Sequence, residues 1–146
     1  MRVMHYSGPV EVITACLDPG EKLLESVRAI IRQHDIRNGV VVSGIATTKK
    51  CRMHYINHTD FPPENTFYSV DEPLEVGSIS GIIADSEPHL HIVAGCRQEK
   101  CWVGHLEDDT EIAYLAELCI LKFNGLAMSR HADTERKISL LGPKNP

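Results

Sequence analysis

The sequence predicts an α+β protein with a mostly antiparallel sheet, barrel-like or two-layered, and one main helix near its N-terminus. One early segment has helical periodicity, and the rest is a series of β-branched segments separated by short polar breaks. The chain has 146 residues, 42% hydrophobic and 24% charged, which is typical of one soluble globular domain. We therefore expect a single domain over residues 1–146, with its core at about 8–123 and a frayed tail at about 142–146.

The N-terminal third predicts a strand followed by a helix. Residues 10–14 are rich in β-branched side chains, and the run Asp18-Pro19-Gly20 ends that strand. Beyond it, apolar residues recur at helical spacing, and Asn38-Gly39 supplies a stop. This pattern predicts a helix over 21–34. Its apolar stripe consists of Leu23, Leu24, Val27, Ile30 and Ile31.

The remaining chain predicts strands. Residues 39–57 favour one long or bent strand, in which Gly44 marks a bulge or a close backbone approach. Residues 58–67 contain two prolines and predict a loop. Further strands are expected, the last of them short, although 111–123 also has helical propensity. They are 72–85, 88–96, 101–109, 111–123 and a final one within 137–146.

Charge and targeting signals limit the possible partners. The net charge is −5, and the densest basic group is only TKKCR near residues 47–52, which argues against tight DNA binding by the chain unaided. No apolar run approaches the roughly eighteen residues of a membrane span, and no secretory signal is visible. We expect a cytoplasmic protein with free cysteines and no membrane contact.

Three histidines suggest a metal site. His89 and His91 form an H-x-H and share a face if their segment is a strand. A hairpin loop centred on Gln98 would place His105 directly opposite His91, with Cβ atoms about 4.5–5.5 Å apart. An even loop or a bulge would instead turn His105 to the other face.

Such a trio could hold an ion with one coordination position open. Three neutral imidazoles plus water is the arrangement of catalytic zinc sites, and iron, nickel or copper also accept imidazole. The alternative interpretation is two polar side chains on a half-exposed sheet. His54 and His58 could form a second pair, but a separation of four residues is not a strand-face spacing. The acidic run 107–111 is interpreted as a solvated turn.

The ordered motifs resemble the plants-and-prokaryotes-conserved (PPC) domain over nearly the whole chain. They are LDPGEKLLESV, VVVSGIAT, GSISGII, PHLHIVAG, VGHL and AELCIL. The resemblance implies an α+β domain that assembles as a homotrimer. It also implies that His89, His91 and His105 meet at a metal, commonly zinc, and that the acid of the A-E step, Glu117, is a candidate site residue.

The chain departs from the family pattern at two positions, and it shows no AT-hook motif. Ala46 and Val103 stand where the family tends to have glycine, so we expect a narrower ligand pocket. The AT-hook that accompanies the domain in plants, and that enters the DNA minor groove, has no counterpart here.

Three functions are therefore considered. The first is a trimeric metal-binding protein, with zinc or another divalent transition metal, that recognises a small ligand or partner in a regulatory role. The second is a hydrolase or lyase that uses metal-bound water, with Glu117 as the first candidate for the general base and Glu87 or Asp85 as alternatives. The third, a DNA-associated regulator, rests on the family's label alone.

Overall fold

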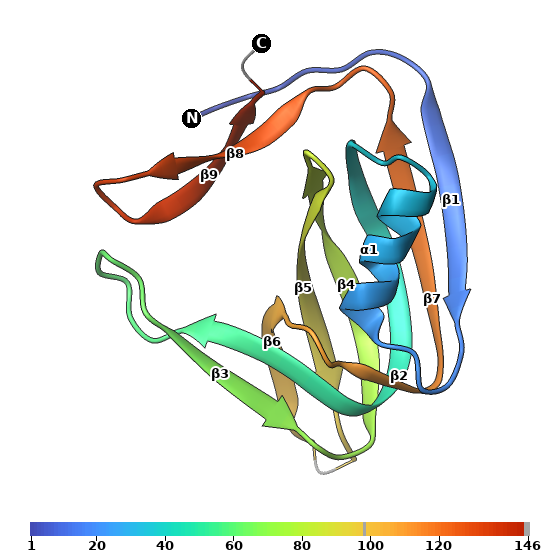
Figure 1. Cartoon of the computed structure of the whole chain (residues 1–146). Helices are drawn as coiled ribbons and strands as arrows, with labels where there is room; N and C mark the ends of the chain where they lie inside the picture. The colour runs from blue at the N-terminus through green and yellow to red at the C-terminus, as the bar shows by residue number, and fades with distance from the viewer. Residues whose placement is uncertain (98, 145–146) are drawn as a thin grey trace.

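The computed structural model describes residues 1–97 and 99–144, which form nine strands in two antiparallel sheets and one helix (Figure 1). The larger sheet has seven strands in the order β1-β7-β2-β4-β5-β6, with β3 paired to β2, and the smaller sheet is the hairpin β8–β9. The elements are β1 Val10–Leu17, α1 Leu23–Gln33, β2 Asn38–Ile56, β3 Asn65–Val70, β4 Leu74–Ala84, β5 Glu87–Gly95, β6 Cys101–Leu106, β7 Glu111–Phe123, β8 Met128–Asp133 and β9 Ile138–Pro143.

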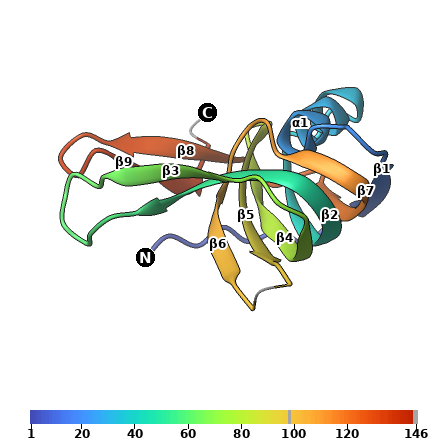
Figure 2. The same cartoon turned by 90° about the horizontal axis from the view of Figure 1, so that it is seen from below.

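The long strand β2 organises the sheet. Its first part lies between β7 and β4, whereas its last residues pair with β3 and β6. Register shifts between Val41 and Ser43, and again between Ala46 and Lys50, mark bulges that bend the strand. The far half of β2 consequently leaves the main layer and extends with β3 towards the β8–β9 hairpin, as Figures 1 and 2 show. The fold is thus two sheets and not one closed barrel.

Helix α1 covers one face of the larger sheet (Figure 1). Four residues of its apolar stripe are buried, as the spacing predicts, and Ile30 is partly buried against the same core. The core lies between helix and sheet. Its largest fully buried side chains include Leu23, Ile31, Ile79, Leu90, Ile92 and Ile120.

The sequence correctly predicts the helix and most strands, including the strand assignment for 111–123. The loop expected over 58–67 is too long, because β3 begins at Asn65 and pairs with β2. The strand β8 was not predicted. The expected frayed tail starts too early: Gly142 and Pro143 belong to β9, and the Lys144 amide donates to the Ala127 carbonyl at 3.0 Å. Residues 145–146 lie outside the described residues.

Helix α1 has eleven residues. No helix in the described part of the chain is long and apolar enough to cross a membrane.

Candidate metal centre

The hairpin β5–β6 has the register that the sequence predicts. His91 pairs with His105, and Gly95 pairs with Cys101, so the two strands are matched about a centre at position 98. Gln98 itself lies outside the described residues. Leu90, Ile92 and Ala94 point into the core. His89 and His91 therefore point to the opposite face of the sheet, where His105 joins them from β6.

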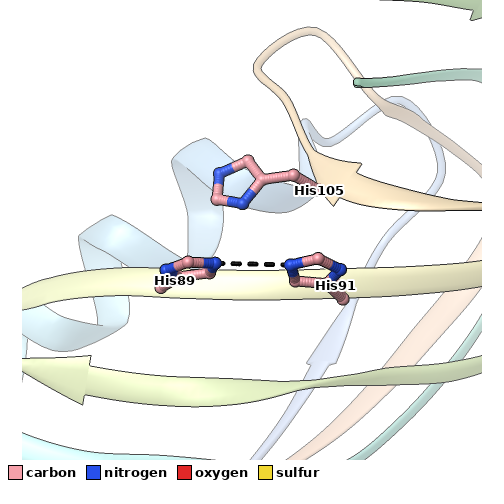
Figure 3. Close-up of side chains that lie close together, drawn as sticks. All are labelled: His89, His91 and His105. Carbon is pink, nitrogen blue, oxygen red and sulfur yellow. Dashed lines mark hydrogen bonds between the residues drawn. The ribbon is translucent and has the colours of Figure 1, made fainter. Parts of the chain in front are cut away.

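The three imidazole rings converge (Figure 3). The Nε2 atoms of His89 and His91 are 3.3 Å apart. The centroid of the His105 ring lies 4.7 Å from that of His89 and 5.5 Å from that of His91. One ligand nitrogen from each ring lies within 4.8 Å of the others. In Figure 3 one nitrogen of His105 faces the other two rings and its second nitrogen points away.

This spacing fits a shared cation. Two nitrogens that each lie about 2.0–2.1 Å from a tetrahedral ion are roughly 3.3 Å apart. The His89–His91 separation already matches that value, and a His105 nitrogen lies within 4.8 Å of both. The described geometry therefore suits one divalent ion with three imidazole ligands.

The electrostatics favour neutral imidazoles, which is the form that binds metals. Burial, with the positive charge of Arg130 as the second cause, lowers the pKa of His89 to about 4. Burial is also the main cause that lowers the pKa of His91 and of His105. At neutral pH each ring has a lone pair to offer.

A glycine in β4 allows β5 to lie where it does. Gly81 has φ +155° and pairs with Leu90. A Cβ at position 81 would lie 1.9 Å from the carbonyl oxygen of His89, which no structure tolerates without a backbone shift. The placement of the His89 ring therefore depends on the absence of a side chain at Gly81.

A fourth histidine lies beside the trio. The His54 ring stacks on His105 with centroids 4.6 Å apart, and its Nδ1 lies 2.5 Å from an Oε1 of Glu107. His54, His105 and Glu107 form a second group whose ligand atoms lie within 4.8 Å of one another. The partners of His54 are thus His105 and Glu107, and the interpretation of Glu107 as a solvated turn residue was wrong.

The sequence carries no local signal for this group. His54 meets His105 because the far end of β2 pairs with β6, and 51 positions separate the two residues along the chain. Gly104 permits the approach, since a Cβ there would lie 2.6 Å from the His54 carbonyl oxygen. The glycine of the G-H-L motif, Gly104, is compatible with a close backbone contact, but it does not indicate which residue makes that contact.

Glu117 is not part of either group. It is exposed on β7, where it pairs with Cys16 and Ile45, and it lines a separate hollow of about 450 Å³. In the sheet order, β2 and β4 separate β7 from β5. The structure therefore does not bring the catalytic candidate Glu117 to the histidines.

The two substituted glycine positions differ in their surroundings, and Val103 lies two residues before His105 on the same face of β6. Ala46 is buried between Val76 and Ala116, and Val103 is exposed on β6.

A curved antiparallel sheet with one covering helix and an imidazole trio on its outer face defines a small α+β protein with a candidate metal centre. The sequence model of the Plants and Prokaryotes Conserved (PCC) domain matches residues 4–124. The chain belongs to this family, as its motifs indicate.

Curated relatives share the sequence only distantly. A bifunctional protein GlmU from Synechococcus sp. is 25% identical over 127 residues, which are 87% of this chain and 20% of the relative. The chain thus spans about a fifth of the length of the curated relatives it matches.

Solved structures confirm the fold. A metal-containing protein from Archaeoglobus fulgidus superposes with a TM-score of 0.81 at 22% identity, over 96% of this chain and 98% of the other. A candidate DNA-binding protein from Bacteroides thetaiotaomicron gives a TM-score of 0.74 at 16% identity, over 97% and 96%. At these identities the likeness is one of fold alone.

Proposed function

We propose that this protein binds a divalent transition metal, zinc first, through His89, His91 and His105, and recognises a small ligand or partner in a regulatory role. The observation that carries the proposal is the 3.3 Å separation of the His89 and His91 ring nitrogens, with His105 directly across the hairpin. Zinc is favoured because it accepts neutral imidazole in a tetrahedral site. When bound, the metal would supply a Lewis-acidic position open to one further ligand.

The fold neighbours are consistent with this proposal. The similar protein from Archaeoglobus fulgidus is described as metal-containing, which makes a metal a reasonable expectation for this chain. His89 and His91 on β5 would supply two ligand nitrogens, whose separation is already close to that around a bound ion. His105 on β6 would supply the third ligand nitrogen. Cytoplasmic location is part of the same proposal.

We propose a homotrimer as the working assembly. Exposed apolar side chains lie on the adjacent strands β2 and β7, where Ile45 and Leu115 line one hollow with Val76. Val42 and Tyr114 lie on the same two strands and are likewise exposed. Apolar surface of this kind favours association with another chain.

The test is metal analysis of protein dialysed against metal-free buffer. Native protein is expected to retain one tightly held ion per chain, and His91→Ala to lose it, because two imidazoles hold zinc far more weakly than three. His5→Ala is the matched control, since His5 is exposed and outside both groups. Full metal content in dialysed His91→Ala would overturn the trio.

A metalloenzyme is the second candidate, favoured by the open position that three ligands leave on a tetrahedral ion. Within one chain the sheet order separates Glu117 from the histidines. The candidate bases are therefore Glu107, which is hydrogen-bonded to His54, and Glu87, which lies two residues before His89 on β5. Hydrolysis of activated esters that is lost in His91→Ala, but not in His5→Ala, would support this function.

DNA association is the third candidate, and the structure weakens its sequence basis. Lys49 pairs with Glu111, and Lys50 pairs with Asp109, so acids neutralise the densest basic stretch. Binding that falls steeply with salt would support it, because phosphate contacts release counterions. No binding at moderate salt would exclude it.

A further inference from the structure

The group formed by His54, His105 and Glu107 lies directly against the proposed metal site and shares one side chain with it. Two imidazoles and one carboxylate are a donor set that iron, zinc and cobalt accept, and the three ligand atoms already lie within 4.8 Å of one another. We propose that these residues form a second, weaker divalent-metal position, with His105 as the ligand common to both.

Several contacts fix the second group independently of the trio. The Glu107 amide donates to the Arg52 carbonyl at 3.0 Å. The buried Thr110 hydroxyl accepts from the Arg52 amide at 2.9 Å. These bonds hold the end of β6 against β2, so the Glu107 carboxylate meets His54 without any ion present.

The His54 ring is confined on both faces. It stacks on His105 on one side, and the Phe67 ring centroid lies 5.0 Å away on the other. Its Nδ1 is engaged with Glu107. A ring held in this way loses little further freedom on binding an ion, which favours ligation.

His105 can serve two ions because its two nitrogens diverge. One nitrogen faces His89 and His91, and the second points away from them (Figure 3). A neutral imidazole carries one ring proton, so bridging two ions releases that proton to solvent. The second ion also displaces the proton held between His54 and Glu107. These two losses make the second position weaker than the first.

The inference builds on the proposed function, since both positions use His105, but its test separates them. Cobalt(II) chloride is titrated into metal-free protein, and bound cobalt is followed by visible absorption and by elemental analysis of the protein fraction. Native protein is expected to bind a tight equivalent and then a weaker one. His54→Ala and Glu107→Gln should each keep the tight equivalent and lose the weaker one.

Variants of the trio give the reciprocal result. His91→Ala should lose the tight equivalent and keep the weaker one, and His105→Ala should lose both. His58→Ala is the control, because His58 lies in the loop after β2, pairs with Glu64 at 3.7 Å and belongs to neither histidine group. It should behave as native protein.

The outcomes are distinguishable. Native protein with one equivalent, unchanged in His54→Ala and absent in His91→Ala, overturns the second position and leaves the trio standing. Binding that survives in His91→Ala and vanishes in His54→Ala overturns the trio and keeps the second group. A weak equivalent that persists in Glu107→Gln also overturns the proposal, because the carboxylate is one of its three ligands.

Discussion

Individual glycines decide whether the histidines can meet. Gly81 lies where a Cβ would strike the His89 carbonyl oxygen, and Gly104 lies where one would strike the His54 carbonyl oxygen. The motifs G-S-I-S-G and G-H-L thus have a physical reason: backbones must approach closely behind the rings. The sequence indicates which histidines are candidate ligands. The structure adds that these two glycines let the strands that carry the histidines approach closely.

A substitution at Gly81 tests this dependence. Gly81→Ala is expected to push β5 away from β4 and to destabilise the protein by about 1–3 kcal/mol, as overpacking does. Because His89 moves with its backbone, zinc retention should also fall. Urea unfolding and metal analysis measure the two effects.

Gly77→Ala is the matched control on the same strand. A Cβ at Gly77 meets nothing within 4 Å, so neither stability nor zinc retention should change appreciably. Equal effects of the two substitutions would show that close approach at Gly81 is not what positions His89.

The elements divide into those that local pattern predicts and those that depend on distant pairing. The helix follows from the helical spacing of its apolar residues. The pairing of β5 with β6 follows from placing the hairpin turn at position 98, so the histidine trio could be predicted. The pairing of β2 with β6 depends on the bending of β2, and no glycine or proline marks the register shifts between Ala46 and Lys50. For that reason the contact of His54 with Glu107 was missed.

Strand β8 and its pairing with β9 were also missed, and a buried hydrogen bond joins β8 to the start of β2. The side-chain carbonyl of Asn38 accepts a hydrogen bond from the Met128 amide at 3.0 Å, and both residues are buried. Asn38→Ala would leave that amide unpaired, at a cost of about 1–3 kcal/mol. We expect faster hydrogen exchange in β8 than in the native protein, with little change in β5.

Asn124→Ala serves as the control for this prediction. Asn124 is exposed and donates to Glu11 at 2.7 Å, so its loss should change stability by less than about 0.5 kcal/mol. Unchanged β8 exchange in Asn38→Ala would mean that other contacts hold the hairpin.

At the scale of the whole molecule, the unpartnered apolar side chains on β2 and β7 favour assembly. A trimer of 16.3 kDa chains has a mass of about 49 kDa, which sedimentation measures directly. We expect that mass for native protein, and a shift towards monomer for Leu115→Glu, because a charge in an apolar interface is poorly solvated. A native species at the mass of one chain would exclude the trimer.

The central claim is that three imidazoles on one face of the β5–β6 hairpin hold a single metal ion. Anomalous scattering from crystals of the metal-loaded protein tests it most directly. We predict one strong peak about 2.0–2.1 Å from a ring nitrogen of each of His89, His91 and His105, with a fourth position free of protein ligands. The absence of a peak at this point, or an ion there enclosed by four protein ligands, would contradict the claim.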